Sequence, residues 1–253
     1  MSDESERAGS HLQRTLGRSA RRTGFRYEPG NILYRLTVAD YVSLVALFFA
    51  WTASLLFLSG ESNYAVVVMF VAFLFDKLDG YLARRLDVTS SLGRQVDSFI
   101  DIFVYLVTAA LLFYYELAPR LVLGAEGEIL RIATSAVVGF CVLAFGGLRL
   151  IRHNNEGFIE DDTGTSHYHG ITVVHVNAVV VLNYLLVLSV APLGLWNGWA
   201  AAATTMVVCP LMVSDYRSPK TEFVHWVVGA ACVVVSAAVL WVEFGLSLAA
   251  LGL

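Results

Sequence analysis

Long apolar stretches separated by short polar segments dominate this chain. A helix of about 20 apolar residues crosses a bilayer, and seven stretches are close to that length, with ends defined to within about 2–4 residues. The apolar runs are continuous and do not alternate with polar residues, which disfavours a membrane β-barrel. The predicted spans are Tyr41–Leu58, Tyr64–Ala83, Gln95–Tyr115, Ile132–Leu150, Ile171–Val190, Gly198–Val213 and Phe223–Trp241.

The two ends of the chain differ in character. Residues 1–35 are polar and rich in Arg, Ser and Gly, and they lack the short apolar core of a signal peptide, so we expect a basic cytoplasmic leader. Residues 36–220 are expected to form one membrane domain. Residues 221–253 are expected to add a C-terminal transmembrane segment, which continues to Leu253 as a longer tilted helix or a short interfacial piece.

Basic residues predict the orientation of the spans. With the N-terminus in the cytoplasm, the leader arginines and the basic residues after spans two, four and six all lie inside, and only Arg120 and Arg131 lie outside. We therefore predict a multi-pass protein of the cytoplasmic membrane whose N-terminus and even-numbered span exits face the cytoplasm.

Composition supports this membrane assignment. Of 253 residues, 57% are hydrophobic and 15% are charged, against about 45–50% and about 25% in an average soluble domain. The net charge of −4 and the absence of a basic patch interleaved with aromatic residues argue against nucleic-acid binding. Cys141, Cys209 and Cys232 lie in apolar stretches, which excludes a disulfide scaffold. The predicted fold class is all-α, a polytopic integral membrane helix bundle.

Four aspartates interrupt the second and third spans. A carboxylate inside a span costs about 2.5–3.5 kcal/mol on insertion scales, so four of them at one level require a compensating partner. Asp76 and Asp79 share one helical face, and Asp97 and Asp101 share another. Because the short loop Leu86–Leu92 makes the two spans antiparallel neighbours, we expect both acidic faces to converge near their cytoplasmic ends.

Carboxylates without nearby His or Cys ligands suit a hard divalent cation such as Mg²⁺ or Mn²⁺. One or two such ions would neutralise the cluster, and two ions also suit phosphoryl transfer. Small residues at positions 80, 83 and 93 leave space for a flat, bulky ligand against the helix backbones. Arg84, at the rim, is placed to pair with a phosphate.

Eight positions follow the pattern D-x2-D-G-x2-A-R-x8-G-x3-D-x3-D without departure. This pattern resembles the signature of the CDP-alcohol phosphotransferases, membrane enzymes that attach phospholipid headgroups. The resemblance implies a six-helix core, to which this chain adds at least one C-terminal span, and a homodimer is common in the family. The matching residues are Asp76, Asp79, Gly80, Ala83, Arg84, Gly93, Asp97 and Asp101.

The resemblance also implies a role for each position. An alcohol attacks the lipid-linked phosphorus of a CDP-lipid, and CMP leaves. Asp101 takes the position of the general base that deprotonates the alcohol, and it is also a candidate metal ligand. The other implied metal ligands are Asp76, Asp79 and Asp97. The positions implied to bind CDP are Asp76, Asp79, Gly80, Ala83, Arg84 and Gly93.

The segment after the fourth span indicates the acceptor alcohol. Serine requires a partner for its carboxylate, and arginine is the best one. The run from Arg149 through Arg152 to Asn154 resembles a segment of the phosphatidylserine synthases, with His153 where that family has phenylalanine. These three residues are the acceptor-binding candidates, and the simpler alternative is that both arginines only anchor a span end. We therefore expect L-serine and a CDP-lipid as substrates.

The kinds of charged residue in the chain bear on the identity of the donor lipid. Lysine is scarce (Lys77 and Lys220) beside 15 arginines, and acids outnumber bases, as in salt-adapted archaea. CDP-archaeol and CDP-diacylglycerol both remain open as the donor lipid. Glycerol 3-phosphate or inositol phosphate are alternative acceptors that would require a denser basic pocket. A divalent-cation transporter is the alternative from another class, and it does not need the Gly80, Ala83 and Arg84 pattern.

Overall fold

The computed structural model describes residues 30–119, 125–160, 166–190, 197–219, 234–235, 237–241 and 243. The chain divides into two units, Met1–Leu36 and Thr37–Leu253. The first contains a short 3-10 helix, η1 (Ile32–Arg35), whose N-terminus is capped by Asn31. Most of the expected leader (1–35) and of the expected span Phe223–Trp241 lies outside the described residues.

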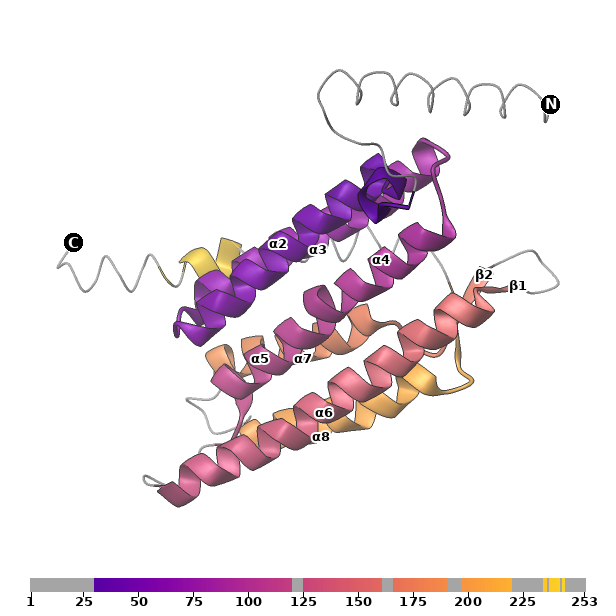
Figure 1. The fold of residues 1–253 in the computed structure, drawn as a ribbon. Coiled ribbons are helices and arrows are strands. Elements are labelled where there is room, and N and C mark those ends of the chain that lie inside the picture. Colours follow the sequence, from indigo (N-terminus) through magenta and orange to yellow (C-terminus); the bar gives the residue numbers. More distant parts are fainter. Residues whose placement is uncertain are drawn as a thin grey trace, which may run out of the picture. The chain divides into compact units, whose positions relative to one another are not determined.

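Helices make up most of the second unit (Figure 1). The segment Ser91–Leu117 is one continuous helix in which two π-helical turns alternate with α-helical turns. The helices are α2 (Val38–Leu58), α3 (Ser62–Arg85), α4 (Ser91–Asp101), η2 (Ile102–Val107), α5 (Thr108–Leu112), η3 (Phe113–Leu117), α6 (Ala125–Glu156), α7 (Val173–Val190), α8 (Gly198–Val208) and η5 (Cys209–Val213).

Three of these helices are long and apolar enough to cross a membrane by length and composition: Val38–Leu58, Ser91–Leu117 and Glu126–Glu156. Two shorter apolar helices cover Val173–Leu188 and Gly198–Val213. The helix α3 is long enough as well, but its last ten residues carry five charged side chains. The predicted all-α polytopic membrane fold is confirmed.

The helix from α4 to η3 lies at the centre of the bundle. It contacts α2, α3, α6 and α7, whereas α2 packs chiefly against α3 and α8 packs against α6 and α7 (Figure 1). Its buried side chains include Ile100, Leu106 and Leu112. Because the third predicted span contacts several other helices, the acidic residues at its start lie close to other elements of the bundle.

Side-chain caps set the starts of two helices near the aspartates. Thr37 and Asp40 form a reciprocal capping box at the start of α2. Ser90 caps α4 by accepting a hydrogen bond from the Gly93 amide at 2.8 Å. The first turns of α2 and α4 are therefore fixed by local sequence.

A small antiparallel sheet, which the sequence did not reveal, lies at the end of α6. It consists of β1 (Ile159–Glu160), β2 (Ser166–His169) and β3 (Arg217–Pro219), in the order β1-β2-β3. Strands of two to four residues carry too little alternation to be read from sequence. The sheet joins the segment after α6 to the segment after η5.

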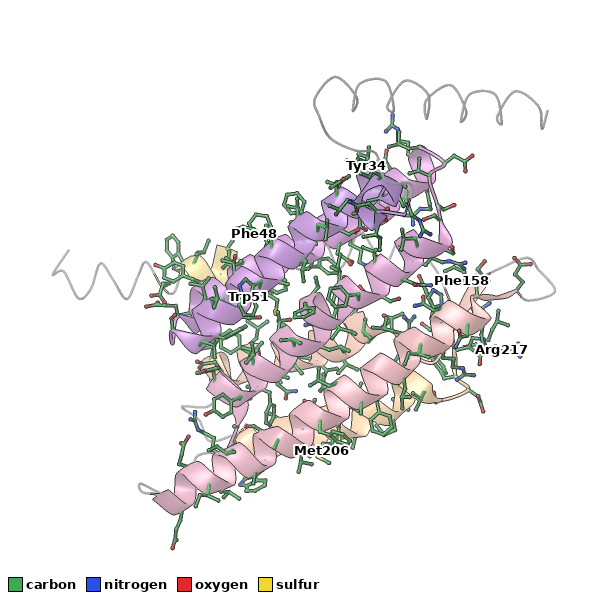
Figure 2. All side chains as sticks on the ribbon, in the orientation of Figure 1. Tyr34, Phe48, Trp51, Phe158, Met206 and Arg217 are labelled. Atoms are coloured by element: carbon green, nitrogen blue, oxygen red, sulfur yellow. The ribbon has the colours of Figure 1, made fainter. Side chains whose placement is uncertain are left out.

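Apolar side chains cover the outside of the helices. Figure 2 shows Phe48 and Met206 on the outer faces of α2 and α8, and their exposed fractions are 63% and 40%. A soluble protein rarely exposes apolar surface on this scale. Together with the long apolar helices, this surface identifies an integral membrane protein.

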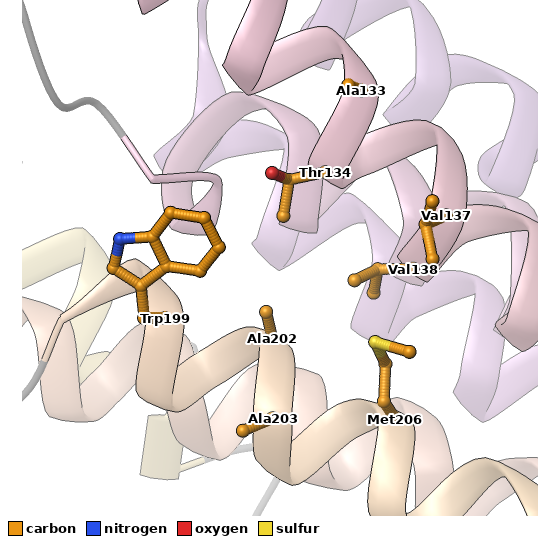
Figure 3. Close-up of a pocket in the computed structure, with 8 residues that line it drawn as sticks. All are labelled: Ala133, Thr134, Val137, Val138, Trp199, Ala202, Ala203 and Met206. Atoms are coloured by element: carbon orange, nitrogen blue, oxygen red, sulfur yellow. The ribbon is translucent and has the colours of Figure 1, made fainter.

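A groove of about 450 Å³ opens between α6 and α8 (Figure 3). No ionisable side chain lines it, so it does not hold the chemistry expected of the aspartates. The lining residues are Ala133, Thr134, Val137 and Val138 from α6, with Trp199, Ala202, Ala203 and Met206 from α8.

Two adjacent glycines of α6 differ in how closely other side chains approach them. A methyl group at Gly146 would lie 2.4 Å from Leu106, which is 1% exposed, whereas one at Gly147 meets nothing within 4 Å. We expect Gly146→Ala to destabilise the protein by about 1–3 kcal/mol through overpacking, and Gly147→Ala to be neutral. Thermal unfolding in detergent measures both, and equal melting temperatures for the two variants would contradict the packing described here.

Candidate active site

Three of the four predicted aspartates meet at one end of the bundle. Asp76 on α3 and Asp97 and Asp101 on α4 each place a carboxylate oxygen so that all three lie within 4.8 Å of one another. The turn between the helices makes this possible, with Asp87 in a left-handed conformation (φ 53°) just after α3 ends. Side chains four residues apart on α4 then face Asp76 together.

Asp79 lies beside this group but is not part of it. Its side chain is buried, and Oδ2 has no hydrogen-bond partner among the described residues. It interacts electrostatically with Asp76 and Asp97. A buried carboxylate oxygen without a donor calls for a further partner, which a bound cation or an ordered water would supply.

Two side chains that the sequence analysis did not single out contact Asp76. Lys77 Nζ lies 2.8 Å from Asp76 Oδ2, and the Tyr105 hydroxyl donates a hydrogen bond to the same oxygen at 2.5 Å. Tyr105 lies on η2, four residues after Asp101. The scarcity of lysine in the spans was the only sequence signal for Lys77, and nothing in the sequence marked Tyr105.

The charges around the cluster do not balance. When all four are ionised, Asp76, Asp79, Asp97 and Asp101 carry two more negative charges than Lys77 and Arg149 neutralise. Arg149 is the guanidinium that interacts electrostatically with both α4 aspartates. Buried charges without compensation are costly. Oxygen ligands and an excess of two negative charges fit one Mg²⁺ or Mn²⁺ ion, so the residues present suit the implied metal.

The ends of α4 and α6 are joined next to the aspartates. Ser98 donates a hydrogen bond to Asn154 Oδ1 at 3.1 Å, directly after Asp97 in the chain. Asp101 is the last residue of α4, where the backbone changes to the π-helical turn η2. Such π-turns often occur at functional sites because they redirect side chains. Here the turn carries Tyr105 toward Asp76.

Arg149 and Arg152 lie one turn apart on α6 and differ in their partners. Arg149 is 5% exposed, its guanidinium carbon lies 5.4 Å from the centre of the Tyr168 ring, and its Nε has no hydrogen-bond partner among the described residues. A buried cation with a free donor is well suited to bind an anionic group.

Arg152 is fully engaged by protein groups. It pairs with Glu156 and Asp215, donates to the carbonyl oxygens of Val213 and Ser214, and contacts His169 Nδ1 at 3.0 Å. These contacts hold the end of α6 against the segment that follows η5. Of the acceptor-binding candidates, Arg149 therefore has a donor without a partner among the described residues, whereas Arg152 and Asn154 join α6 to other elements.

Tyr168 forms one wall beside Arg149. It lies on β2, packs against His153 and Phe158, and interacts electrostatically with Asp101. Burial raises the pKa of its hydroxyl above the ordinary value, so the ring remains a neutral surface. The position of Tyr168 depends on Gly170, two residues later in the chain. There φ is +67°, and a methyl group would lie 2.3 Å from the Met212 carbonyl oxygen.

The small residues of the motif have different neighbours. A methyl group at Gly80 would lie 3.5 Å from Arg84 Nη1, so the exposed guanidinium of Arg84 lies over this glycine. A methyl group at Gly93 would lie 2.9 Å from Asp40 Oδ1. Gly93 thus lets α4 approach the capping carboxylate of α2, a contact that the sequence analysis did not anticipate although the T-x-x-D cap was visible in the sequence.

Comparison with known proteins identifies one family. The sequence profile of the CDP-alcohol phosphatidyltransferase family matches residues 36–248. An archaetidylserine synthase of Methanothermobacter thermautotrophicus is 26% identical over 190 residues, which cover 74% of this chain and 71% of that protein. A CDP-diacylglycerol–serine O-phosphatidyltransferase of Methanocaldococcus jannaschii is 31% identical over 127 residues, or 49% of this chain and 53% of that protein.

The contact between Gly93 and Asp40 generates a prediction. We expect Gly93→Ala to lower the melting temperature in detergent, because the capping box holds Asp40 in the space that the methyl group needs. In an Asp40→Ala background the same change should cost markedly less, so the two effects are not additive. A double-mutant cycle of thermal unfolding measures this coupling, and strictly additive effects would contradict the contact.

Proposed function

This chain belongs to the CDP-alcohol phosphatidyltransferase family, as its eight-position motif indicated, and we propose that it transfers the lipid phosphate group of a CDP-lipid to the hydroxyl of L-serine, releasing CMP. The names of its two relatives support serine as the acceptor. The observation that carries the proposal is Arg149, a buried guanidinium with a free Nε beside the α4 aspartates. A zwitterionic acceptor with one carboxylate fits that single cation.

In this proposal each residue of the site has a defined task. Arg149 holds the serine carboxylate, and the neutral face of Tyr168 lies alongside it. Asp101 accepts the proton of the serine hydroxyl as the hydroxyl oxygen attacks the lipid-linked phosphorus. The bond from that phosphorus to the CMP oxygen breaks, so CMP leaves. Holding both reactants next to Asp101 supplies the proximity that the reaction needs.

The metal requirement follows from the carboxylates. We propose that Asp76, Asp79, Asp97 and Asp101 hold Mg²⁺ or Mn²⁺, which would stabilise the negative charge of the pyrophosphate during transfer. The same proposal assigns nucleotide binding to Gly80, Ala83 and Arg84 with the adjoining aspartates. Gly93 contributes by allowing α4 to approach α2, which keeps Asp97 in register with Asp76.

The lipid and the cellular setting complete the proposal. The archaeal relatives and the arginine-rich composition favour CDP-archaeol, and CDP-diacylglycerol would use the same site. The unequal distribution of basic residues favours a cytoplasmic membrane location with the site facing the cytoplasm. We further propose a homodimer, residues 36–220 as the catalytic domain, and residues 221–253 as an additional membrane segment.

An acceptor screen tests the central claim. Purified protein in detergent with CDP-archaeol or CDP-diacylglycerol and Mn²⁺ or Mg²⁺ is expected to release CMP when L-serine is added. Glycerol 3-phosphate and inositol phosphate are expected to give only background release of CMP. One arginine balances the single charge of a carboxylate better than the two charges of a phosphate dianion. Release with either phosphate but not with serine would overturn the acceptor assignment, and no release with any alcohol would favour the transport alternative.

The two arginines of α6 provide a matched pair of variants. We expect Arg149→Ala to raise the KM for serine by about tenfold to a hundredfold, the loss of one charge-assisted hydrogen bond, with a smaller effect on the KM for the CDP-lipid. Arg152→Ala is expected to lower the melting temperature and leave the KM for serine nearly unchanged. Steady-state kinetics distinguish the two, and equal effects on serine KM would contradict the separate roles.

A further inference from the structure

Lys77 lies inside the carboxylate cluster. Its ammonium is 2.8 Å from Asp76 Oδ2, and it lies 5.5 Å from the ring centres of both Phe73 and Tyr105. The side chain is 37% exposed, whereas that of Asp76 is 3% exposed. The ammonium thus lies near both aromatic rings, and it is directed at the most buried carboxylate of the group of three.

A lysine near the end of a membrane span ordinarily directs its ammonium toward the lipid headgroups and water. Arg85 on the same helix is exposed, and its Nη1 donates to the Tyr81 hydroxyl away from the aspartates. Lys77 differs because its ammonium points inward, so anchoring the span in the interface does not explain its position. Its contacts are those of a counter-ion.

The carboxylate that Lys77 contacts is also one that a divalent ion would require. Asp76 Oδ2 already accepts the Tyr105 hydroxyl and the ammonium, and Asp76 belongs to the group of three aspartates whose oxygens lie within 4.8 Å of one another. An ammonium and a divalent cation repel each other strongly at such distances in a site of low dielectric constant. Both cannot be bound fully to this carboxylate.

We propose that Lys77 is an internal counter-cation, which stabilises the aspartate cluster when no metal is bound and competes with the divalent ion for Asp76. The affinity of the site for metal is then lower than the carboxylates alone would give, and the protein folds stably without the ion. This inference rests on the metal dependence in the proposed function. It adds a role for a residue that the family motif leaves unspecified.

The test uses variants that keep or remove the charge. Lys77→Met keeps an unbranched apolar side chain without the charge, and Lys77→Arg keeps a cation. Arg85→Met removes the same charge from the same helix outside the cluster and serves as the control. Mn²⁺ affinity is measured by calorimetry in detergent without CDP-lipid, and melting temperatures are measured in excess EDTA and in saturating Mn²⁺.

We expect Lys77→Met to bind Mn²⁺ at least tenfold more tightly than the wild type. Its melting temperature should fall in EDTA and return to the wild-type value in saturating Mn²⁺, which also demonstrates that the variant folds. Lys77→Arg should show no gain in affinity. The Mn²⁺ affinity of Arg85→Met should stay within about twofold of the wild type, because the charge of the exposed Arg85 is screened by water and salt.

Two results would overturn the inference while leaving the proposed function intact. One is a wild-type Mn²⁺ affinity and a wild-type melting temperature in EDTA for Lys77→Met. The other is an equal gain in affinity for Arg85→Met, which would indicate a general effect of net charge. If neither the wild type nor Lys77→Met bound Mn²⁺, the metal dependence of the proposed function would itself be contradicted, together with this inference.

Discussion

The burial of several carboxylates at one end of an apolar helix bundle is the constraint on which the rest of this structure depends. Asp76 and Asp79 are almost fully buried on α3, and Asp101 is half-buried where α4 meets the first π-turn. Charges in such surroundings are stable only with partners. The neighbouring elements supply those partners in part, through Lys77, Tyr105 and Arg149. The remaining negative charge is what makes the end of the bundle suited to a cation and a phosphorylated ligand.

The surrounding contacts keep these groups in place. The Ser90 cap sets the start of α4, the Ser98–Asn154 hydrogen bond ties α4 to α6, and the close approach of Gly93 to Asp40 joins α4 to α2. Each contact lies within a few residues of an aspartate. A site that must position two reactants requires this kind of rigid support.

The two arginines of α6 have different surroundings although they lie one turn apart. They are three residues apart and have the same chemistry, yet Arg152 is held by the segment after η5 whereas Arg149 turns toward Tyr168 and the aspartates. The small sheet is responsible for this difference, because it places both His169 and Tyr168 next to α6. In the proposed function, recognition of the acceptor therefore depends on a loop region as much as on the helices.

The sequence by itself determined the membrane fold, the family and the identity of the acidic residues. Runs of apolar residues mark the membrane helices, because each run is a property of neighbouring residues in the chain. The spacing of Asp76, Asp97 and Asp101 places them on facing sides of adjacent spans, because helical periodicity is local as well. The tertiary structure alone decided which side chains meet across helices. The pairing of Lys77 with Asp76, the Tyr105 hydrogen bond, the contact between Gly93 and Asp40, and the separate roles of Arg149 and Arg152 all join residues through packing. Such contacts depend on π-turns, on short strands and on the rotation of each helix, and none of these leaves a periodic signal in the chain.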